Sequence, residues 1–286
     1  MKRTFGILFG TAAVAACAST GGNMKKENGR GEEKQNAVTL LKSIETGDAA
    51  AVAVINPSKY IQHNPMVGDG LAGFGELMKQ LPPGSAKVST VRAFQDGDFV
   101  FTHTEYNFFG PKIGFDLFRF EDGKIVEHWD NLQEWRDKPN PSGRTMTDGS
   151  TTVRDLDKTE ANKALIAAFV NEVLVQGQMD KVRNFFAGDS YLQHNPMVAD
   201  GVSGLGAALA EMAKQGIAMK FDRVHKILGE GNFVLTVAEG SFGGKPTSFY
   251  DLYRVEGGKI AEHWDVIETL LPSDQHKNKN GKFGGL

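Results

Sequence analysis

The stretch YIQHNPMVGDG at residues 60–70 returns almost unchanged as YLQHNPMVADG at residues 191–201. The copies differ only by Ile against Leu at the second position and Gly against Ala at the ninth. A second pair follows in the same order, with GKIVEHWD at 123–130 and GKIAEHWD at 258–265. Two matched motifs in one order at so long a period indicate a duplicated domain rather than a solenoid of short repeats.

Length and composition fit two soluble domains. The chain has 286 residues, of which 40% are hydrophobic and 23% are charged, so each half can build a core. The formal net charge is −3, and no basic field is available for a phosphate backbone. Nucleic acid is therefore not an expected partner.

The N-terminus has the pattern of an export signal. Lys2 and Arg3 precede an uncharged run that ends at Cys17, the single cysteine of the chain. The run is too short to span a bilayer as a helix. The small residues before Cys17 resemble the lipobox of bacterial lipoproteins, which predicts a signal peptide over 1–17 and lipidation of Cys17. An ordinary signal peptide cleaved nearby is the alternative.

The following stretch, 18–32, is polar and rich in glycine, which predicts a flexible tether between the lipid and the first domain. The expected location is therefore that of an exported bacterial lipoprotein, held to the membrane through its anchor. Ala18 after the cysteine favours the outer membrane, facing the periplasm, if the cell is Gram-negative.

The remaining chain divides into two copies of one plan. We expect the first domain at 33–137, a linker at 138–156, the second domain at 157–272 and a loose tail at 273–286. Each copy begins with helical periodicity and ends with β-rich runs joined by short turns such as Asp122-Gly123. Helices followed by antiparallel hairpins make an α+β domain.

The last hairpin of each copy carries the candidate chemistry. If Asp122-Gly123 is a two-residue loop, counting outward places Leu117 opposite His128 and Phe115 opposite Asp130. The same count in the second copy places Leu252 opposite His263 and Tyr250 opposite Asp265. Alternation along a strand would put each His and Asp pair on one face.

A carboxylate in apolar surroundings tends toward a raised pKa, which suits a general acid or base near neutral pH. A purely structural hydrogen bond within the sheet is an equal alternative. Arg119 and Arg254 fall on the same predicted face. If buried, they would hold the aspartates ionised, whereas at the rim they would not.

Three further histidines are candidates. His63 and His194 lie in the Asn-Pro turns, where tying the turn to a neighbouring strand is the simpler role. His103 lies on a strand, and its counterpart in the second copy is Val237. The first copy is therefore the better equipped for acid–base chemistry.

Taken together, the repeated motifs and the DLFRFEDGKIVEHWD hairpin resemble the SnoaL-like polyketide cyclase family, and within it the predicted SnoaL-like aldol-condensation proteins. The resemblance covers about 33–137 and 157–272. It implies the nuclear transport factor 2-like fold, shared with ketosteroid isomerase and scytalone dehydratase. The chain would then form two tandem cone-shaped α+β barrels, each a curved antiparallel sheet wrapped around helices and an apolar cavity.

The resemblance also implies roles. Asp130 would be the acid or base, His128 or His103 its helper, and His63 a residue at the cavity mouth. Asp265, His263 and His194 match in the second copy, where Val237 leaves the helper position without a histidine. The substrate pocket would be lined by Phe115, Leu117, Arg119, Tyr250, Leu252 and Arg254. The characterised cyclases use no metal or organic cofactor, and family habit implies that the two domains pack as an intramolecular pseudo-dimer.

Three functions follow. The first is a cofactor-free cyclase, isomerase or lyase that moves protons beside a carbonyl of a small apolar molecule. The second is a non-catalytic protein that binds a hydrophobic small molecule or a protein partner. The third, ranked last because no ligand spacing marks it, is a metal site made of His63, His103, His128 and Asp130.

Overall fold

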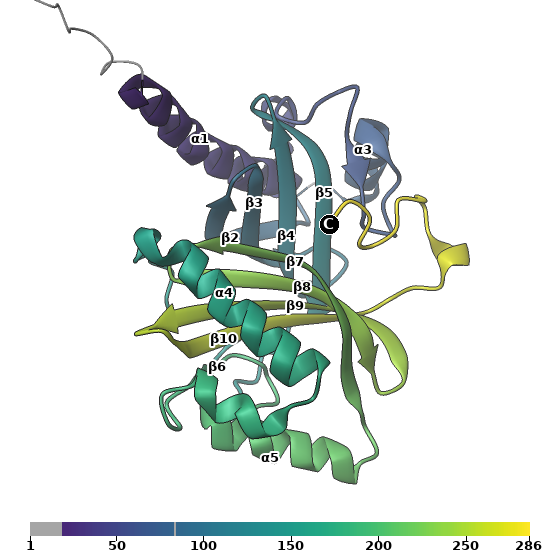
Figure 1. Ribbon diagram of the computed structural model, residues 1–286. Coiled ribbons are helices and arrows are strands. Elements are labelled where there is room, and N and C mark those ends of the chain that lie inside the picture. The colour runs from purple at the N-terminus through teal and green to yellow at the C-terminus, as the bar shows by residue number, and fades with distance from the viewer. Residues whose placement is uncertain (1–18, 83) are drawn as a thin grey trace, which may run out of the picture.

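The computed structural model of the chain describes residues 19–82 and 84–286, with side chains from residue 31 onward (Figure 1). The predicted signal segment 1–17 and Cys17 lie outside the described residues. In the part of the chain that the structure describes, no helix is both long and apolar enough to cross a membrane.

The first domain contains three helices, one short strand and four long strands. They are α1 (Ser19–Thr46), α2 (Ala49–Val52), β1 (Ile61–Gln62), α3 (Gly70–Gln80), β2 (Lys87–Asp96), β3 (Phe99–Asn107), β4 (Pro111–Glu121) and β5 (Lys124–Glu134). Helix α1 begins within 18–32, where the sequence predicted a flexible tether.

The second domain repeats this order. Its elements are η1 (Leu156–Lys158), α4 (Thr159–Phe169), η2 (Val170–Val175), η3 (Met179–Phe185), β6 (Leu192–Gln193), α5 (Gly201–Lys214), β7 (Met219–Glu230), β8 (Phe233–Phe242), β9 (Lys245–Glu256), β10 (Lys259–Thr269) and η4 (Ser273–Gln275). The strand orders are β1-β5-β4-β3-β2 and β6-β10-β9-β8-β7, so both sheets have the same topology. The α+β prediction is confirmed in both copies.

The β4–β5 hairpin has the predicted two-residue loop but not the predicted register. Glu121 pairs with Lys124 across Asp122 and Gly123, which have φ values of 49° and 72°. Two residues after Lys124, Val126 has no partner on β4. It forms a β-bulge, and from there on the pairing of the two strands is shifted by one residue.

The bulge places His128 opposite Phe118 and Asp130 opposite Asp116, so the predicted pairings with Leu117 and Phe115 are wrong. The second domain has the same bulge at Ala261. There His263 pairs with Tyr253 and Asp265 with Asp251, not with Leu252 and Tyr250. Counting from the loop could not detect an unpaired residue.

Each sheet has an inner face, covered by the helices of its own domain. In the first domain Ala37, Leu40 and Leu41 of α1 pack on Val100 and Phe118 of the sheet. In the second domain Ile166 and Phe169 of α4 pack on Val234 and Tyr253. These clusters bury the apolar stripes that the helical periodicity predicted.

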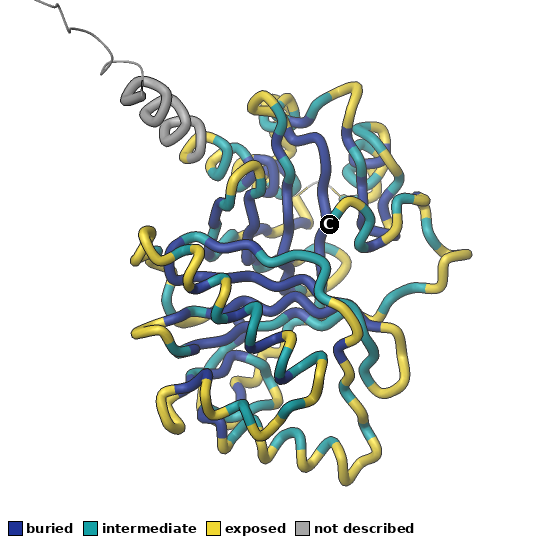
Figure 2. The backbone as a smooth tube through the Cα atoms, in the orientation of Figure 1, coloured by how far each residue is buried: buried dark blue, intermediate teal, exposed yellow. Residues whose placement is uncertain are grey.

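The outer faces of the two sheets pack against each other, and Figure 1 shows the strands of the second sheet running across those of the first. The cluster between them includes Phe101, Phe115, Leu117, Trp129, Leu235, Tyr250, Leu252 and Trp264. Figure 2 shows both sheets buried through this region, with exposed residues at hairpin tips and on the outer sides of helices. Asn131 donates to the backbone oxygen of Val266 at 2.6 Å across the same contact.

Two segments cross between the domains in matching ways. We call residues 140–150 the linker strap and residues 278–286 the tail strap. Asn140 donates to the Gln193 oxygen at 2.6 Å, and Asn278 donates to the Asn64 oxygen at 2.7 Å. The tail, expected to be loose, is therefore held on the first domain, because its amide side chains satisfy backbone oxygens beside the QHNP motif.

Candidate functional site

The inner face of the first sheet carries a compact group of polar side chains, which we call site 1: Asp116, His128 and Asp130. His128 Nε2 lies 3.2 Å from Asp116 Oδ1, and the ring of His128 stacks on Phe118 at 4.8 Å. The three side chains are buried, with residue exposures of 3% for Asp116, 8% for His128 and 5% for Asp130. Burial without full pairing is costly for carboxylates, which makes this group a candidate for function.

The repeated QHNP motif positions this group. Strand β1 pairs in parallel with β5, so Gln62 lies beside His128. Gln62 Oε1 accepts from the Asn64 backbone at 2.8 Å and from His128 Nδ1 at 3.0 Å. Asn64 in turn donates to Asp130 Oδ2 at 2.6 Å. Gln62 and Asn64 therefore connect the first repeated motif to this buried polar group.

These contacts fix the proton position on the imidazole. Gln62 Oε1 is an acceptor, because it already accepts from a backbone N–H, so His128 Nδ1 is the donor. His128 Nε2 then faces Asp116 Oδ1, and a second proton must lie between these two atoms for a hydrogen bond to form. Asp116 and His128 thus share a proton that can be held by either group.

Tyr106 completes the group from β3. Its hydroxyl donates to Asp116 Oδ2 at 2.6 Å. Burial raises the pKa of Tyr106 well above its ordinary value, so the phenol stays protonated. Burial also raises the pKa of Asp116, and the hydrogen bond from His128 only partly opposes it. Such a carboxyl can exchange a proton with its imidazole partner under ordinary conditions.

Arg119, Phe115 and Leu117 do not line this site. The bulge puts them on the outer face, where Phe115 and Leu117 belong to the interdomain core. Arg119 Nε donates to Glu127 Oε2 at 2.8 Å. The same correction applies in the second domain, where Arg254 Nε donates to Glu262 at 2.6 Å and Tyr250 and Leu252 are interdomain core residues.

His63 and His194 are also on the outer side. His63 Nε2 lies 2.8 Å from Glu127 Oε1, and its ring stacks on Trp129 at 4.7 Å. His194 has the matching contacts with Glu262, at 2.9 Å, and Trp264, at 4.7 Å. Both tie the turn to the neighbouring strand, as the simpler sequence interpretation expected.

His103 lies on the outer face as well, because alternation along β3 separates it from inner residues such as Thr102. Arg92 Nη1 donates to His103 Nδ1 at 2.8 Å, and the ring stacks on Phe115. Burial, with the charge of Arg92, lowers the pKa of His103 well below its ordinary value. His103 therefore lies on the opposite face from Asp130 and is not placed to act as its helper. For the same reason the predicted metal set of His63, His103, His128 and Asp130 is not brought together.

The second domain repeats the group as site 2: Asp251, His263 and Asp265. His263 Nε2 lies 2.9 Å from Asp251 Oδ1, and His263 Nδ1 donates to Gln193 Oε1 at 3.0 Å. Asn195 donates to Asp265 Oδ2 at 2.7 Å. Each of sites 1 and 2 offers one imidazole nitrogen and two carboxylate oxygens within 4.8 Å of one another, which is the spacing that a single metal ion would need.

The two sites differ in two groups. The position of Tyr106 on β3 is matched on β8 by Gly240, so Asp251 has no phenol partner. Lys282 of the tail strap lies 2.8 Å from Glu268 Oε2 and 3.7 Å from Asp130 Oδ1. Site 1 thus has a hydroxyl and an ammonium group that site 2 lacks.

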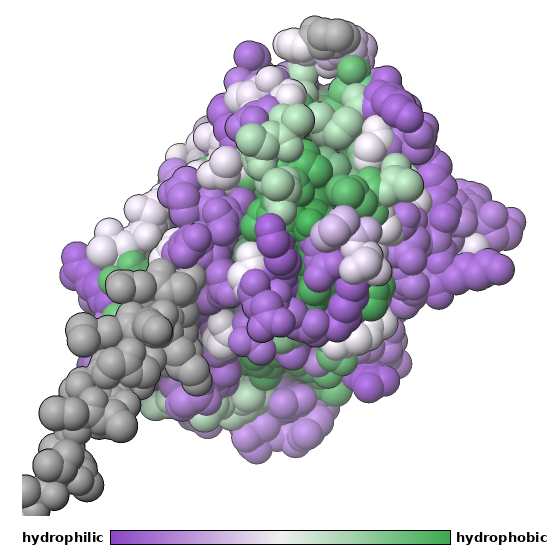
Figure 3. Space-filling view, turned by 90° about the horizontal axis from the view of Figure 1, so that it is seen from above, coloured by the Kyte–Doolittle hydropathy of each residue, from purple (hydrophilic) through white to green (hydrophobic). Residues whose placement is uncertain are grey.

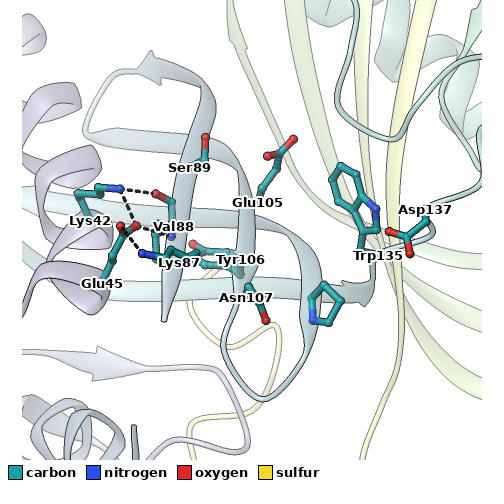
Figure 4. A pocket seen from close by; sticks show the side chains of 11 residues that line it. Lys42, Glu45, Lys87, Val88, Ser89, Glu105, Tyr106, Asn107, Trp135 and Asp137 are labelled. Atoms are coloured by element: carbon teal, nitrogen blue, oxygen red, sulfur yellow. Dashed lines mark hydrogen bonds and ion pairs between the residues drawn. The ribbon is translucent and has the colours of Figure 1, made fainter. Parts of the chain in front are cut away.

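Two hollows lie near site 1. The larger, about 430 Å³, runs along α1, β2 and the end of β3. Figure 4 shows Trp135 and Asp137 on one side of it and Lys42 and Glu45 on the other, with Tyr106 between. Tyr106 is the residue that this hollow shares with site 1.

The smaller hollow, about 210 Å³, lies between residues 66–68, which follow the QHNP motif, and helix α3. It is lined by Met66, Val67, Gly68, Gly73, Glu76, Leu77, Gln80 and Lys277. It therefore adjoins the segment that holds Asp130 through Asn64.

Sequence reasoning found His128, Asp130 and their repeats but missed several partners: Gln62, Asn64, Tyr106, Asp116, Gln193, Asn195 and Asp251. Part of the signal was present. Both copies keep the aspartate in FDLFR and YDLYR and the glutamine and asparagine in QHNP. Only the bulged register shows that these residues face the imidazole.

Comparison with known proteins gives one family. The model described as SnoaL-like polyketide cyclase matches residues 164–275, which make up most of the second domain. The first domain has the same strand order and both repeated motifs. No curated protein matches this chain.

Several solved structures are similar to one domain's length of the chain. TsrD from Streptomyces laurentii is 18% identical over 36% of this chain and 90% of its own, with a TM-score of 0.32. An LEH-like epoxide hydrolase of M. tuberculosis is 24% identical over 39% and 85%, with a TM-score of 0.30. An NTF2-like protein of unknown function from Cytophaga hutchinsonii is 16% identical over 35% and 89%, with a TM-score of 0.31.

Proposed function

We propose that this chain is a cofactor-free acid–base enzyme acting on a small apolar carbonyl compound, with site 1 as its catalytic centre; the match of residues 164–275 to the SnoaL-like polyketide cyclase model supports this class of reaction. The carrying observation is the buried contact of 3.2 Å between His128 Nε2 and Asp116 Oδ1, beside Asp130, whose Oδ1 has no hydrogen-bond partner. One group can release a proton while its neighbour accepts one, which is the requirement of an isomerase, cyclase or lyase of this type.

The chemistry assigns a role to each group. Asp130 Oδ1 takes a hydrogen from the carbon next to the carbonyl, and the electron pair of the broken C–H bond moves to the carbonyl oxygen as an enolate. The proton between His128 Nε2 and Asp116 Oδ1 passes to that oxygen, or to a second carbonyl attacked by the enolate carbon, when the oxygen replaces Asp116 as the partner of Nε2. In an isomerisation Asp130 returns its proton at another carbon and the enol oxygen returns its proton to His128, so no proton is gained or lost overall. Tyr106 keeps Asp116 oriented during the transfer.

The end of the first domain supports an apolar substrate. Figure 3 shows a hydrophobic band, surrounded by hydrophilic residues, on the end of the molecule that carries α1 and α3. The smaller hollow lies at α3, next to the segment that positions Asn64. In this proposal the molecule enters there and reaches the inner face between Asn64 and Tyr106.

The activity can be tested before the substrate is known. Exchange of α-hydrogens for deuterium in a panel of small cyclic and aliphatic ketones reports the first proton transfer directly. We expect exchange above the buffer rate and a loss of roughly 10²–10⁴-fold in Asp130→Asn. The matched control Asp265→Asn in site 2 should retain the activity.

A non-catalytic binding protein is the competing function, and the closed packing around site 1 favours it, since all three residues are at most 8% exposed. Saturable ketone binding with no exchange, or equal exchange in wild type and Asp130→Asn, would replace the enzyme proposal with this one.

The proposal includes export and anchoring through Cys17, on the sequence pattern alone. The lipid would hold the chain at a bacterial membrane, at the periplasmic face of the outer membrane in a Gram-negative cell. The two domains would stand in for the subunits of a homodimer. Palmitate labelling of the wild type, lost in Cys17→Ser, tests the anchor, and labelling that persists in the variant would refute it.

A further inference from the structure

Site 2 leaves carboxylate oxygens without donors. Asp251 Oδ2 and Asp265 Oδ1 have no hydrogen-bond partner, and Asp251 is only 5% exposed. A buried acceptor that lacks a donor costs free energy, which a proton or a bound ligand offsets.

The first missing donor results from an exchange of side chains between adjacent strands. In the first domain Tyr106 fills the space beside Gly114, where a Cβ would lie 2.8 Å from the tyrosine ring. The second domain has Gly240 and Phe249 at these two positions. In the second domain the aromatic ring comes from the neighbouring strand, as Phe249, and carries no hydroxyl. Asp251 Oδ2 therefore lacks the phenol donor that Asp116 Oδ2 has.

The second missing group is an ammonium. The straps can be matched through their shared contacts, because Trp129 donates to the Gly284 oxygen and Trp264 to the Asp148 oxygen. This match places Met146 of the linker strap where Lys282 lies in the tail strap. Met146 is buried in the interdomain core.

The charged groups around the two sites therefore differ. Site 1 has Lys282 within 3.7 Å of Asp130. In site 2, among the described residues, the only ion pair recorded for Asp251 is with His263, and Asp265 has none with Lys or Arg. Two carboxylates and one imidazole remain without a permanent cation.

The imidazole of site 2 is oriented as a metal ligand would be. His263 Nδ1 donates to Gln193 Oε1 at 3.0 Å, and the same oxygen accepts from the Asn195 backbone at 2.9 Å. This fixes His263 Nε2 as the nitrogen that faces the carboxylates. A second hydrogen bond of this kind, on the far ring nitrogen, is what orients metal-bound histidines.

From these observations we infer that site 2 binds one divalent transition-metal ion through Asp251, His263 and Asp265. Their ligand atoms lie within 4.8 Å of one another. One imidazole with two carboxylates suits Zn²⁺, Mn²⁺, Fe²⁺ or Co²⁺ rather than a soft monovalent ion. Site 1 has the same ligands, but there the Lys282 ammonium, which Glu268 holds at 2.8 Å, already serves as the cation beside Asp130.

The test uses the untagged full chain after dialysis against a chelator. Titration with Zn²⁺ by calorimetry gives the stoichiometry, and the visible absorption of Co²⁺ reports coordination by nitrogen and oxygen. We expect one ion per chain. Asp251→Asn and His263→Gln should weaken binding by roughly 100-fold or more, whereas the matched variant Asp116→Asn in site 1 should bind as the wild type does.

A third variant tests the charge argument. Met146→Lys places an ammonium beside site 2, as Lys282 does in site 1, and should abolish metal binding while circular dichroism shows a folded chain. The inference is overturned by an absence of binding, by two ions per chain, or by binding that is lost in Asp116→Asn instead of Asp251→Asn. None of these results bears on the ketone exchange assigned to site 1, so the two proposals fail separately.

Discussion

Asn64 donates a 2.6 Å hydrogen bond to the carboxylate of Asp130, and Asn195 makes the equivalent bond of 2.7 Å to Asp265. This contact joins the two sequence motifs that recur in each half of the chain. The QHNP turn supplies the donor, and the EHWD strand supplies the acceptor. The motifs recur together because the asparagine of one donates to the buried aspartate of the other.

Replacing Asn64 by Ala should therefore destabilise the protein by about 1–3 kcal/mol, since Asp130 Oδ2 would lose its donor while remaining buried. Denaturant unfolding followed by tryptophan fluorescence measures the change. Asn195→Ala should give a smaller loss, because Asp265 is only partly buried. Equal stability of Asn64→Ala and wild type would show that this bond contributes nothing.

Tyr106→Phe removes the hydroxyl bound to Asp116 and keeps the ring that fills the space beside Gly114. We expect a loss of stability of about 1–2 kcal/mol and a fall in α-hydrogen exchange. Tyr250→Phe is the matched control, because the Tyr250 hydroxyl is buried without a partner. Its removal should be neutral or stabilising, and a larger cost for Tyr250→Phe than for Tyr106→Phe would contradict this account.

The ion pair between Glu127 and Arg119 on the outer face should make the free energy of unfolding depend on pH. Burial alone would raise its pKa, but the hydrogen bonds from His63 and Arg119 outweigh it, and the pKa of Glu127 is lowered. A carboxyl with a lowered folded pKa stabilises the protein above its unfolded value and loses that effect as the pH falls through the folded value.

The comparison of wild type with Glu127→Gln tests this sign. The stability difference should be largest near neutral pH and should shrink as the solution is acidified below the ordinary glutamate value of 4.5. Thermal melts over a pH series measure it. A difference that grows on acidification would show that Glu127 is not held ionised.

Lys282→Met should destabilise the contact between the tail strap and the first domain. It removes the ammonium that lies 2.8 Å from Glu268, although Glu268 keeps the hydrogen bond from the Leu132 N–H and, at 22% exposed, some solvation. We expect the free energy of unfolding to fall by somewhat less than the loss of about 3–5 kcal/mol that follows when one partner of a fully buried pair is removed. Adding Glu268→Gln should recover part of it, and a double variant no more stable than Lys282→Met alone would rule out this pair as the cause.

The sequence by itself determined the duplication, the order of elements and the positions of the tight hairpins. These features depend on local chemistry: repeated motifs, helical and strand periodicity, and Asp-Gly or Gly-Gly pairs that accept positive φ. His128, Asp130, His263 and Asp265 were found in the same way, because imidazole and carboxylate groups among apolar strand residues are conspicuous.

Only the tertiary structure decided which residues meet them. One unpaired residue, Val126 or Ala261, turns Arg119 and Arg254 to the outer face and brings Asp116 and Asp251 to the inner one, since a shift of one residue exchanges the two faces of a strand. The straps, and with them Lys282 and Met146, reach their places through contacts with the other domain. No local pattern encodes such a contact, because its partners are distant in the chain and meet only when both sheets have packed.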